Sequence, residues 1–155
     1  MALAKDWMIP SANAPYLGCV NVDVSPFGYA DFLAGAGAPQ VLYYGEVLPV
    51  NWTATDFAVT FYAGQAGTTT WSMQAACFAP GSAVTGTPAY GPAVSAIGTA
   101  SGSGSLATAT LMGVAANGVA ECAPGAAVQY RLTRTDASEV IDAYVIGTTE
   151  TLRSN

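Results

Sequence analysis

The residues that could do acid–base or metal chemistry gather near the C-terminal end of the chain. The segment VQYRLTRTDASEVIDAYVIGTTETLR, residues 128–153, holds three of the four basic residues of the protein and four of its acids. Arg134, Asp136, Glu139 and Asp142 stand closest together. Two carboxylates held across a cleft with separated pKa values could act as general acid and base. Grouped carboxylates could also bind a metal ion.

A structural role fits these charges better than a catalytic one. The acids lie in one short connection beside an arginine, where an ion pair would tie the connection to the last strand. We therefore predict a structural latch formed by Arg134, Asp142 and Asp136. The segment predicts no catalytic residue and no metal ligand.

The remaining residue types exclude most other catalytic sites. The chain has no histidine, which removes Ser-His-Asp and Cys-His arrangements. Its cysteines, Cys19, Cys77 and Cys122, lack the spacing of a zinc or redox motif. Two alternatives stay open for them: a Cys77–Cys122 disulfide, and three buried free thiols, which we favour. The chain is not expected to be an enzyme, and no cofactor is expected.

Charge and hydropathy limit the partners. The net charge is −6, and four cations cannot supply the affinity for a phosphate backbone or an anionic membrane surface. The sequence predicts no transmembrane helix, since Gly, Thr, Ser and Pro interrupt every apolar run. The N-terminal residues MALAKDWMIPSANAP are not expected to form a signal peptide.

Alternating segments separated by Gly, Pro and Ser predict β-strands. Their length and spacing, without a helix of three or more turns, indicate an all-β sandwich or barrel in one domain. Aromatic residues on such strands, among them Trp52, Tyr62 and Trp71, belong more often to a core than to a sugar-stacking platform. The predicted strand segments are 41–50, 57–63, 68–79, 106–114, 126–135 and 142–152.

The middle of the chain is free of charge. The 64 residues from Phe57 to Ala120 contain no Asp, Glu, Lys or Arg, yet they include several large aromatic residues and must fold. Exposed strand edges are normally protected by charged side chains. We therefore expect that the sheets close on themselves or that neighbouring subunits cover their edges.

The first 40 residues differ from the rest. They are rich in Ala and Gly and show no sustained alternation. An arm that packs on a neighbour and an opening hairpin with a long loop both fit this composition, and we favour the arm. We thus divide the chain into an N-terminal arm or irregular extension, 1–40, and a sandwich domain, 41–155.

The order of motifs from about residue 42 to residue 152 resembles small phage virion proteins with a jelly-roll β-sandwich. The motifs are VLP (47–49), NWTATDFAVTFYAG, TTTWSMQAACFAPGSAV, PGAAVQYRLTRTD and IDAYVIGTTETL. One departure is Ala63, where such proteins often carry a second Trp. The resemblance implies a jelly-roll-like antiparallel sandwich and a structural role in the virion, as capsid decoration, head fibre or tail component.

Two hypotheses for function follow. In the first, the chain is a virion protein, assembled in the host cytoplasm, that self-associates, commonly as a homotrimer, and binds a major capsid or tail protein. In the second, it is a carbohydrate-binding sandwich that contacts a host glycan through neutral hydrogen-bonding groups and the aromatic residues Trp52, Tyr62 and Trp71. We favour the first.

Overall fold

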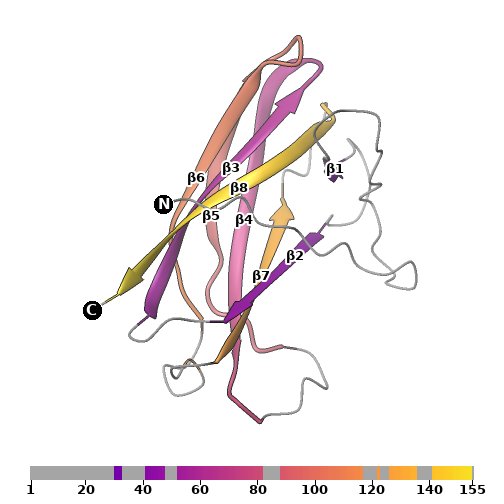
Figure 1. Ribbon diagram of the computed structural model, residues 1–155. Helices are drawn as coiled ribbons and strands as arrows, with labels where there is room; N and C mark the ends of the chain where they lie inside the picture. Colours follow the sequence, from indigo (N-terminus) through magenta and orange to yellow (C-terminus); the bar gives the residue numbers. More distant parts are fainter. Residues whose placement is uncertain are drawn as a thin grey trace, which may run out of the picture.

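The chain folds into two antiparallel sheets packed face to face (Figure 1). The structure is a computed structural model, and it describes residues 30–32, 41–47, 52–81, 88–116, 122, 126–135 and 141–154. Sheet I contains, in spatial order, β1 (Ala30–Phe32), β8 (Ala143–Ser154), β3 (Trp52–Ala63) and β6 (Leu106–Val114). Sheet II contains β2 (Val41–Val47), β7 (Ala127–Arg134), β4 (Ala66–Phe78) and β5 (Val94–Ser101).

The strand order is that of a jelly roll. The orders β1-β8-β3-β6 and β2-β7-β4-β5 pair strands that lie far apart in the sequence, as in two Greek keys wound together. The predicted all-β jelly-roll sandwich is therefore confirmed. Three residues of the segment predicted as an arm form β1, which pairs with β8 and belongs to the sandwich. Residues 1–29 and 33–40 lie outside the described residues, and the arm stays a prediction for them.

The core lies between the sheets and is built by strict alternation. On β3, Phe57, Val59 and Phe61 point inward and are fully buried, while the residues between them are partly exposed. Trp71 of β4 lies at the centre, with its ring edge-on to Phe32 at 5.0 Å between centroids. Aromatic pairs in this geometry add to the free energy gained by burying their area.

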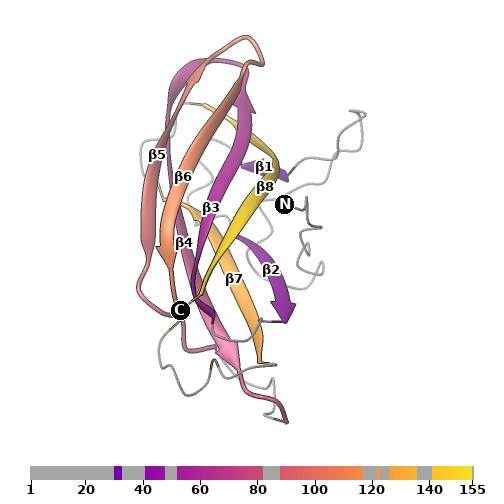
Figure 2. The ribbon, with the colours of Figure 1, turned by 60° about the vertical axis from the view of Figure 1, so that its left-hand side comes forward.

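Two short turns lock together at one end of the sandwich. Gly64 and Gln65 join β3 to β4, and residues 102–105 join β5 to β6, both at the top of Figures 1 and 2. The Ser103 N–H donates to the Gly64 carbonyl at 3.1 Å. Gly102 and Gly104 have φ of 82° and 72°, which L side chains rarely adopt. The turn therefore holds β5 beside β6, although these strands belong to different sheets.

A disulfide joins Cys77, near the end of β4, to Cys122. The favoured expectation of free thiols is thus not what the structure shows for this pair, and Cys19 lies outside the described residues. The two cysteines are 45 residues apart, and the enclosed loop contains β5 and β6. A crosslink of this span lowers the conformational entropy of the unfolded chain far more than that of the folded chain, and this stabilises the fold.

We predict that replacing Cys77 and Cys122 together by Ser lowers the free energy of unfolding by about 2–4 kcal/mol, because the unfolded chain regains the entropy of the open loop. Urea denaturation with and without a thiol reductant measures the loss. The reductant should weaken the wild-type protein and leave the double variant unchanged. Equal sensitivity of both proteins to the reductant would show that the bridge does not stabilise the fold.

Candidate functional site

Arg134, the centre of the predicted latch, is a buried link between the two sheets. Its side chain is 2% exposed at the end of β7 in sheet II. Its Nη1 donates to the Phe32 carbonyl oxygen at 2.7 Å, and its Nη2 donates to the Ile141 carbonyl oxygen at 2.8 Å. Phe32 ends β1 and Ile141 lies just before β8, so the guanidinium ties sheet II to sheet I.

The carboxylate part of the latch stays a prediction. Asp142 follows Ile141 directly and is exposed, while Asp136 lies outside the described residues. The hydrogen bonds described for Arg134 go to backbone carbonyl oxygens, which no side-chain pattern could have indicated. The arginine is therefore structural, as expected, but its described acceptors are main-chain atoms.

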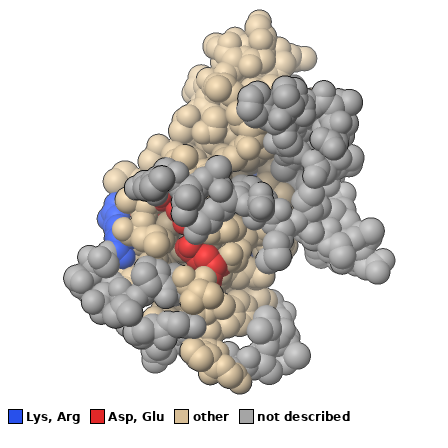
Figure 3. Space-filling view, in the orientation of Figure 1, with Lys and Arg blue, Asp and Glu red and all other residues tan. Residues whose placement is uncertain are grey.

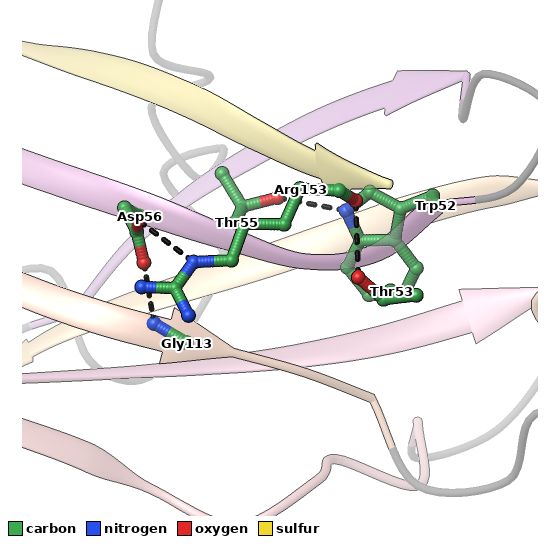
Figure 4. Close-up of polar contacts among 6 residues, drawn as sticks. All are labelled: Trp52, Thr53, Thr55, Asp56, Gly113 and Arg153. Atoms are coloured by element: carbon green, nitrogen blue, oxygen red, sulfur yellow. Dashed lines mark hydrogen bonds and ion pairs between the residues drawn. The ribbon is translucent and has the colours of Figure 1, made fainter. Parts of the chain in front are cut away.

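Two of the three aromatic residues proposed for sugar contact are part of the core. Trp71 is fully buried, and Trp52 is nearly so. The Trp52 indole Nε1–H donates to Thr55 Oγ1 at 2.9 Å (Figure 4). A sugar cannot reach either ring, so neither can serve as a stacking platform.

The Trp52–Thr55 bond belongs to a buried chain of hydrogen bonds. Thr55 Oγ1 lies 2.7 Å from the Tyr130 hydroxyl, and this hydroxyl donates to Glu46 Oε1 at 3.1 Å. Burial raises the pKa of Tyr130 well above its ordinary value, and the negative charge of Glu46 raises it further, against the opposing effect of the hydrogen bond from Thr55. The phenol therefore stays protonated and donates, which makes this network a second polar link between the sheets.

Tyr62 lies on the outer face of sheet I and stacks on Tyr144. The two residues are directly opposite each other on β3 and β8, with ring centroids 4.8 Å apart and ring planes 21° apart. On its other side Tyr62 is opposite Leu106 of β6, which is 67% exposed. We call Leu106, Tyr62 and Tyr144 the tyrosine row. The two stacked rings are partly exposed, and with Leu106 they form an apolar surface.

The tyrosine row continues on β1 with Asp31, which is directly opposite Tyr144. In Figure 3 the upper end of the described surface shows neither basic nor acidic side chains, and the charges lie lower on this face. Below the row, the outward positions of sheet I are mostly hydroxyl-bearing. They include Thr60, Thr108, Thr110, Thr149 and Thr151.

An ion pair connects the strands at the lower end of sheet I (Figure 4). Arg153 Nε lies 2.8 Å from Asp56 Oδ2, and Asp56 Oδ1 accepts from the Gly113 N–H at 2.6 Å. These contacts join β8, β3 and β6. The pair could not be predicted from the sequence, because Asp56 and Arg153 are 97 residues apart. The Arg153 side chain is 45% exposed, so solvent weakens the attraction.

Arg131 is the centre of a polar cluster on the outer face of sheet II. Tyr43, Arg131 and Gln74 lie side by side on β2, β7 and β4. The Arg131 Cζ atom is 4.3 Å from the centroid of the Tyr90 ring, a cation–π contact, and its Nη2 donates to Gln74 Oε1. The Arg131 Nε–H is buried, and in the described part of the chain it has no hydrogen-bond acceptor.

Tyr90 fixes this cluster from the segment before β5. Its hydroxyl donates to Gln129 Oε1 at 2.6 Å. Burial raises the pKa of Tyr90 to about 12, with a further increase from Tyr43 and an opposing effect of Arg131. Sequence reasoning did not single out Tyr90 or Gln129, since Tyr90 stands alone in a loop segment and Gln129 carries no charge. We call Arg131, Tyr90, Tyr43, Gln74 and Gln129 the arginine cluster.

The described residues contain no grouping of three or more His, Cys, Asp or Glu side chains that could hold a metal ion. Within the same part of the chain, no helix is long and apolar enough to cross a membrane.

Comparison with solved structures finds a distant likeness. A structure of TmCBM61 in complex with β-1,4-galactotriose aligns with a TM-score of 0.40 and 6% sequence identity, covering 81% of this chain and 71% of that one. At this level of similarity nothing about the function of the chain follows from it. No model of a protein family matches the sequence, and no curated protein matches it.

We predict that Arg134→Met lowers the free energy of unfolding by about 2–4 kcal/mol, because the carbonyl oxygens of Phe32 and Ile141 lose their buried charged donor. The matched control is Arg153→Met, which removes an exposed ion pair worth less than about 1 kcal/mol. Urea denaturation of both variants measures how much free energy of unfolding each substitution removes. Equal stability of the two would contradict a structural role for Arg134.

Proposed function

We propose that the chain is a non-enzymatic structural protein of a bacteriophage virion, as capsid decoration, head fibre or tail component. It self-associates, as a homotrimer, and binds a major capsid or tail protein in the particle. The observation that carries the proposal is the uncharged, apolar edge formed by β5 and β6. We call this the β5–β6 edge.

The β5–β6 edge has the properties of an assembly surface. Each of these strands ends its sheet, so each has a row of backbone groups without a neighbouring strand in that sheet. Large apolar side chains on the outer faces next to the edge are exposed: Ile97 by 68% on sheet II, and Leu106 by 67% and Met112 by 62% on sheet I. Soluble monomers usually protect such edges with charges, and β5 and β6 carry none.

The distribution of charge favours a second copy of the chain as the occupant of this edge. The charged residues of the strands all lie on β1, β2, β3, β7 and β8. A protein with a net charge of −6 repels its own copies unless they meet through a neutral surface. The β5–β6 edge is such a surface, and contact there buries apolar side chains without desolvating a charge.

We predict that the wild-type protein has a solution mass three times that of one 15.7 kDa chain, measured by light scattering over a range of concentrations. Replacing Ile97 and Met112 together by Lys should yield the monomer, since each new subunit contact would then bury unpaired charges. The control is Val47→Lys, on a side chain that is 69% exposed on β2. It should leave the assembly intact. A wild-type monomer at all concentrations that also fails to bind phage particles would refute the proposal.

The tyrosine row supports a second candidate function, a lectin-like carbohydrate-binding sandwich. Tyr62 and Tyr144 are stacked on each other, so their exposed edges and the neighbouring Leu106 side chain form one apolar surface on which a pyranose ring can lie. The threonine hydroxyls below them can donate to and accept from sugar hydroxyls. Binding sites for neutral sugars commonly combine an apolar platform with a few polar groups of this kind.

For this second candidate, we predict that Tyr62→Ala and Tyr144→Ala each abolish binding on a glycan array, because each removes half of the platform. Tyr144→Phe keeps the ring and should retain binding, which makes it the matched control. Neither alanine variant alters the β5–β6 edge at Ile97 or Met112, so assembly measured by light scattering should persist. An array on which the wild type binds no glycan excludes the second candidate and leaves the first in place.

A further inference from the structure

The arginine cluster has the features of a binding site that neither candidate function uses. Arg131 lies on the outer face of sheet II, away from both the β5–β6 edge and the tyrosine row of sheet I. In the part of the chain that the structure describes, its contacts are the Tyr90 ring and the Gln74 amide, and no carboxylate pairs with it. The charge of Arg131 is therefore not neutralised by the fold.

The Arg131 Nε–H has no hydrogen-bond acceptor among the described residues, although it has almost no surface open to solvent. A buried donor without an acceptor costs free energy, and more so when the group is charged. Charged side chains on an outer sheet face usually extend into water and avoid this cost. Arg131 instead lies against Tyr90 and is partly exposed, so the open part of its guanidinium can meet a planar anion through charge-assisted hydrogen bonds.

The cluster is held rigid before any ligand arrives. Tyr90 is anchored through its hydroxyl to Gln129, and Gln74 Nε2 donates to the Gly91 carbonyl oxygen at 2.9 Å. The segment beneath is closely packed, since a Cβ at Gly91 would come within 2.2 Å of the Ala115 carbonyl oxygen. A guanidinium fixed in this way loses little conformational entropy on binding, which favours affinity.

The groups around Arg131 define the class of ligand. The Tyr43 and Tyr90 hydroxyls and the Gln74 and Gln129 amides are neutral donors and acceptors, and they suit the hydroxyls of a sugar. Arg131 is a single cation in a protein of net charge −6, so it can neutralise one carboxylate at a time. This suits an acidic sugar, which carries one carboxylate per sugar unit, and disfavours a polyphosphate, whose closely spaced charges need several cations. We infer that the arginine cluster binds an acidic sugar, with the uronate carboxylate on Arg131 and the pyranose hydroxyls on the flanking amides and phenols.

Titration calorimetry with trigalacturonate and with neutral galactotriose tests the inference. The acidic trimer should bind, and the neutral trimer of equal length should bind at least about tenfold more weakly, since it lacks the charge-assisted hydrogen bonds. Arg131→Gln should abolish the preference for the acidic trimer. Arg131→Lys should lower the affinity by about tenfold, because it keeps the charge and loses the planar fork. Arg153→Gln, which removes an arginine on sheet I, should bind as the wild type does.

Thermal denaturation of each variant shows whether a loss of binding reflects a loss of fold. Tyr62→Ala should retain trigalacturonate binding, which separates this site from the tyrosine row. The Ile97→Lys/Met112→Lys variant should also retain it, so the inference stands or fails independently of the proposed assembly. Equal affinity of the folded wild-type protein for both trimers, or unchanged binding by a folded Arg131→Gln variant, would overturn the assignment.

Discussion

The buried guanidinium of Arg134 is the interaction on which the rest of the sandwich depends. Two sheets packed face to face share no backbone ladder, so apolar contact alone would let them slide or rotate. Arg134 and the Tyr130–Thr55 network are both directional links, and β7 supplies the sheet II side of each. Their acceptors and donors lie on β1, β3 and the approach to β8, so together they fix how sheet I lies over sheet II.

The polar links between the two sheets come from strands other than β5 and β6, and β5 and β6 contain no charged residue. Arg134 and Glu46 lie on strands away from the β5–β6 edge, and the Asp56–Arg153 pair reaches β6 through the Gly113 N–H. On the neutral side β5 and β6 are held together by the glycine turn and by the small residues between them. Gly98 is essential there, since a Cβ would meet the Phe61 ring at 2.5 Å. Close approach of the two sheets at this edge therefore requires small residues, and it leaves the larger apolar side chains pointing into solvent.

Strands in which large apolar side chains alternate with polar ones could be predicted from the sequence. A strand that consists mainly of small side chains was missed. The segments around Phe57 and Trp71 are confirmed as β3 and β4, because bulky inward residues alternate clearly with polar ones. The strand β5, VSAIGTAS, gave no such signal, since its inward positions are filled by Ala and Gly beneath Phe61. The polar contacts could not be predicted either. Arg134 binds main-chain oxygens, and Arg153 pairs with an acid at the far end of the sequence.

The three surfaces can operate together because the jelly roll separates them. The tyrosine row lies outside sheet I, the arginine cluster lies outside sheet II, and the β5–β6 edge lies where the two sheets meet. Subunits joined along the edge would cover the outer-face positions next to it, Leu106 and Met112 on sheet I and Ile97 on sheet II, and would leave the rest of both faces open; Leu106 also belongs to the tyrosine row. Assembly would thus alter the surroundings of Tyr62 more than those of Arg131. A particle surface built in this way presents many copies of each face, and weak binding at each copy would add up to strong attachment.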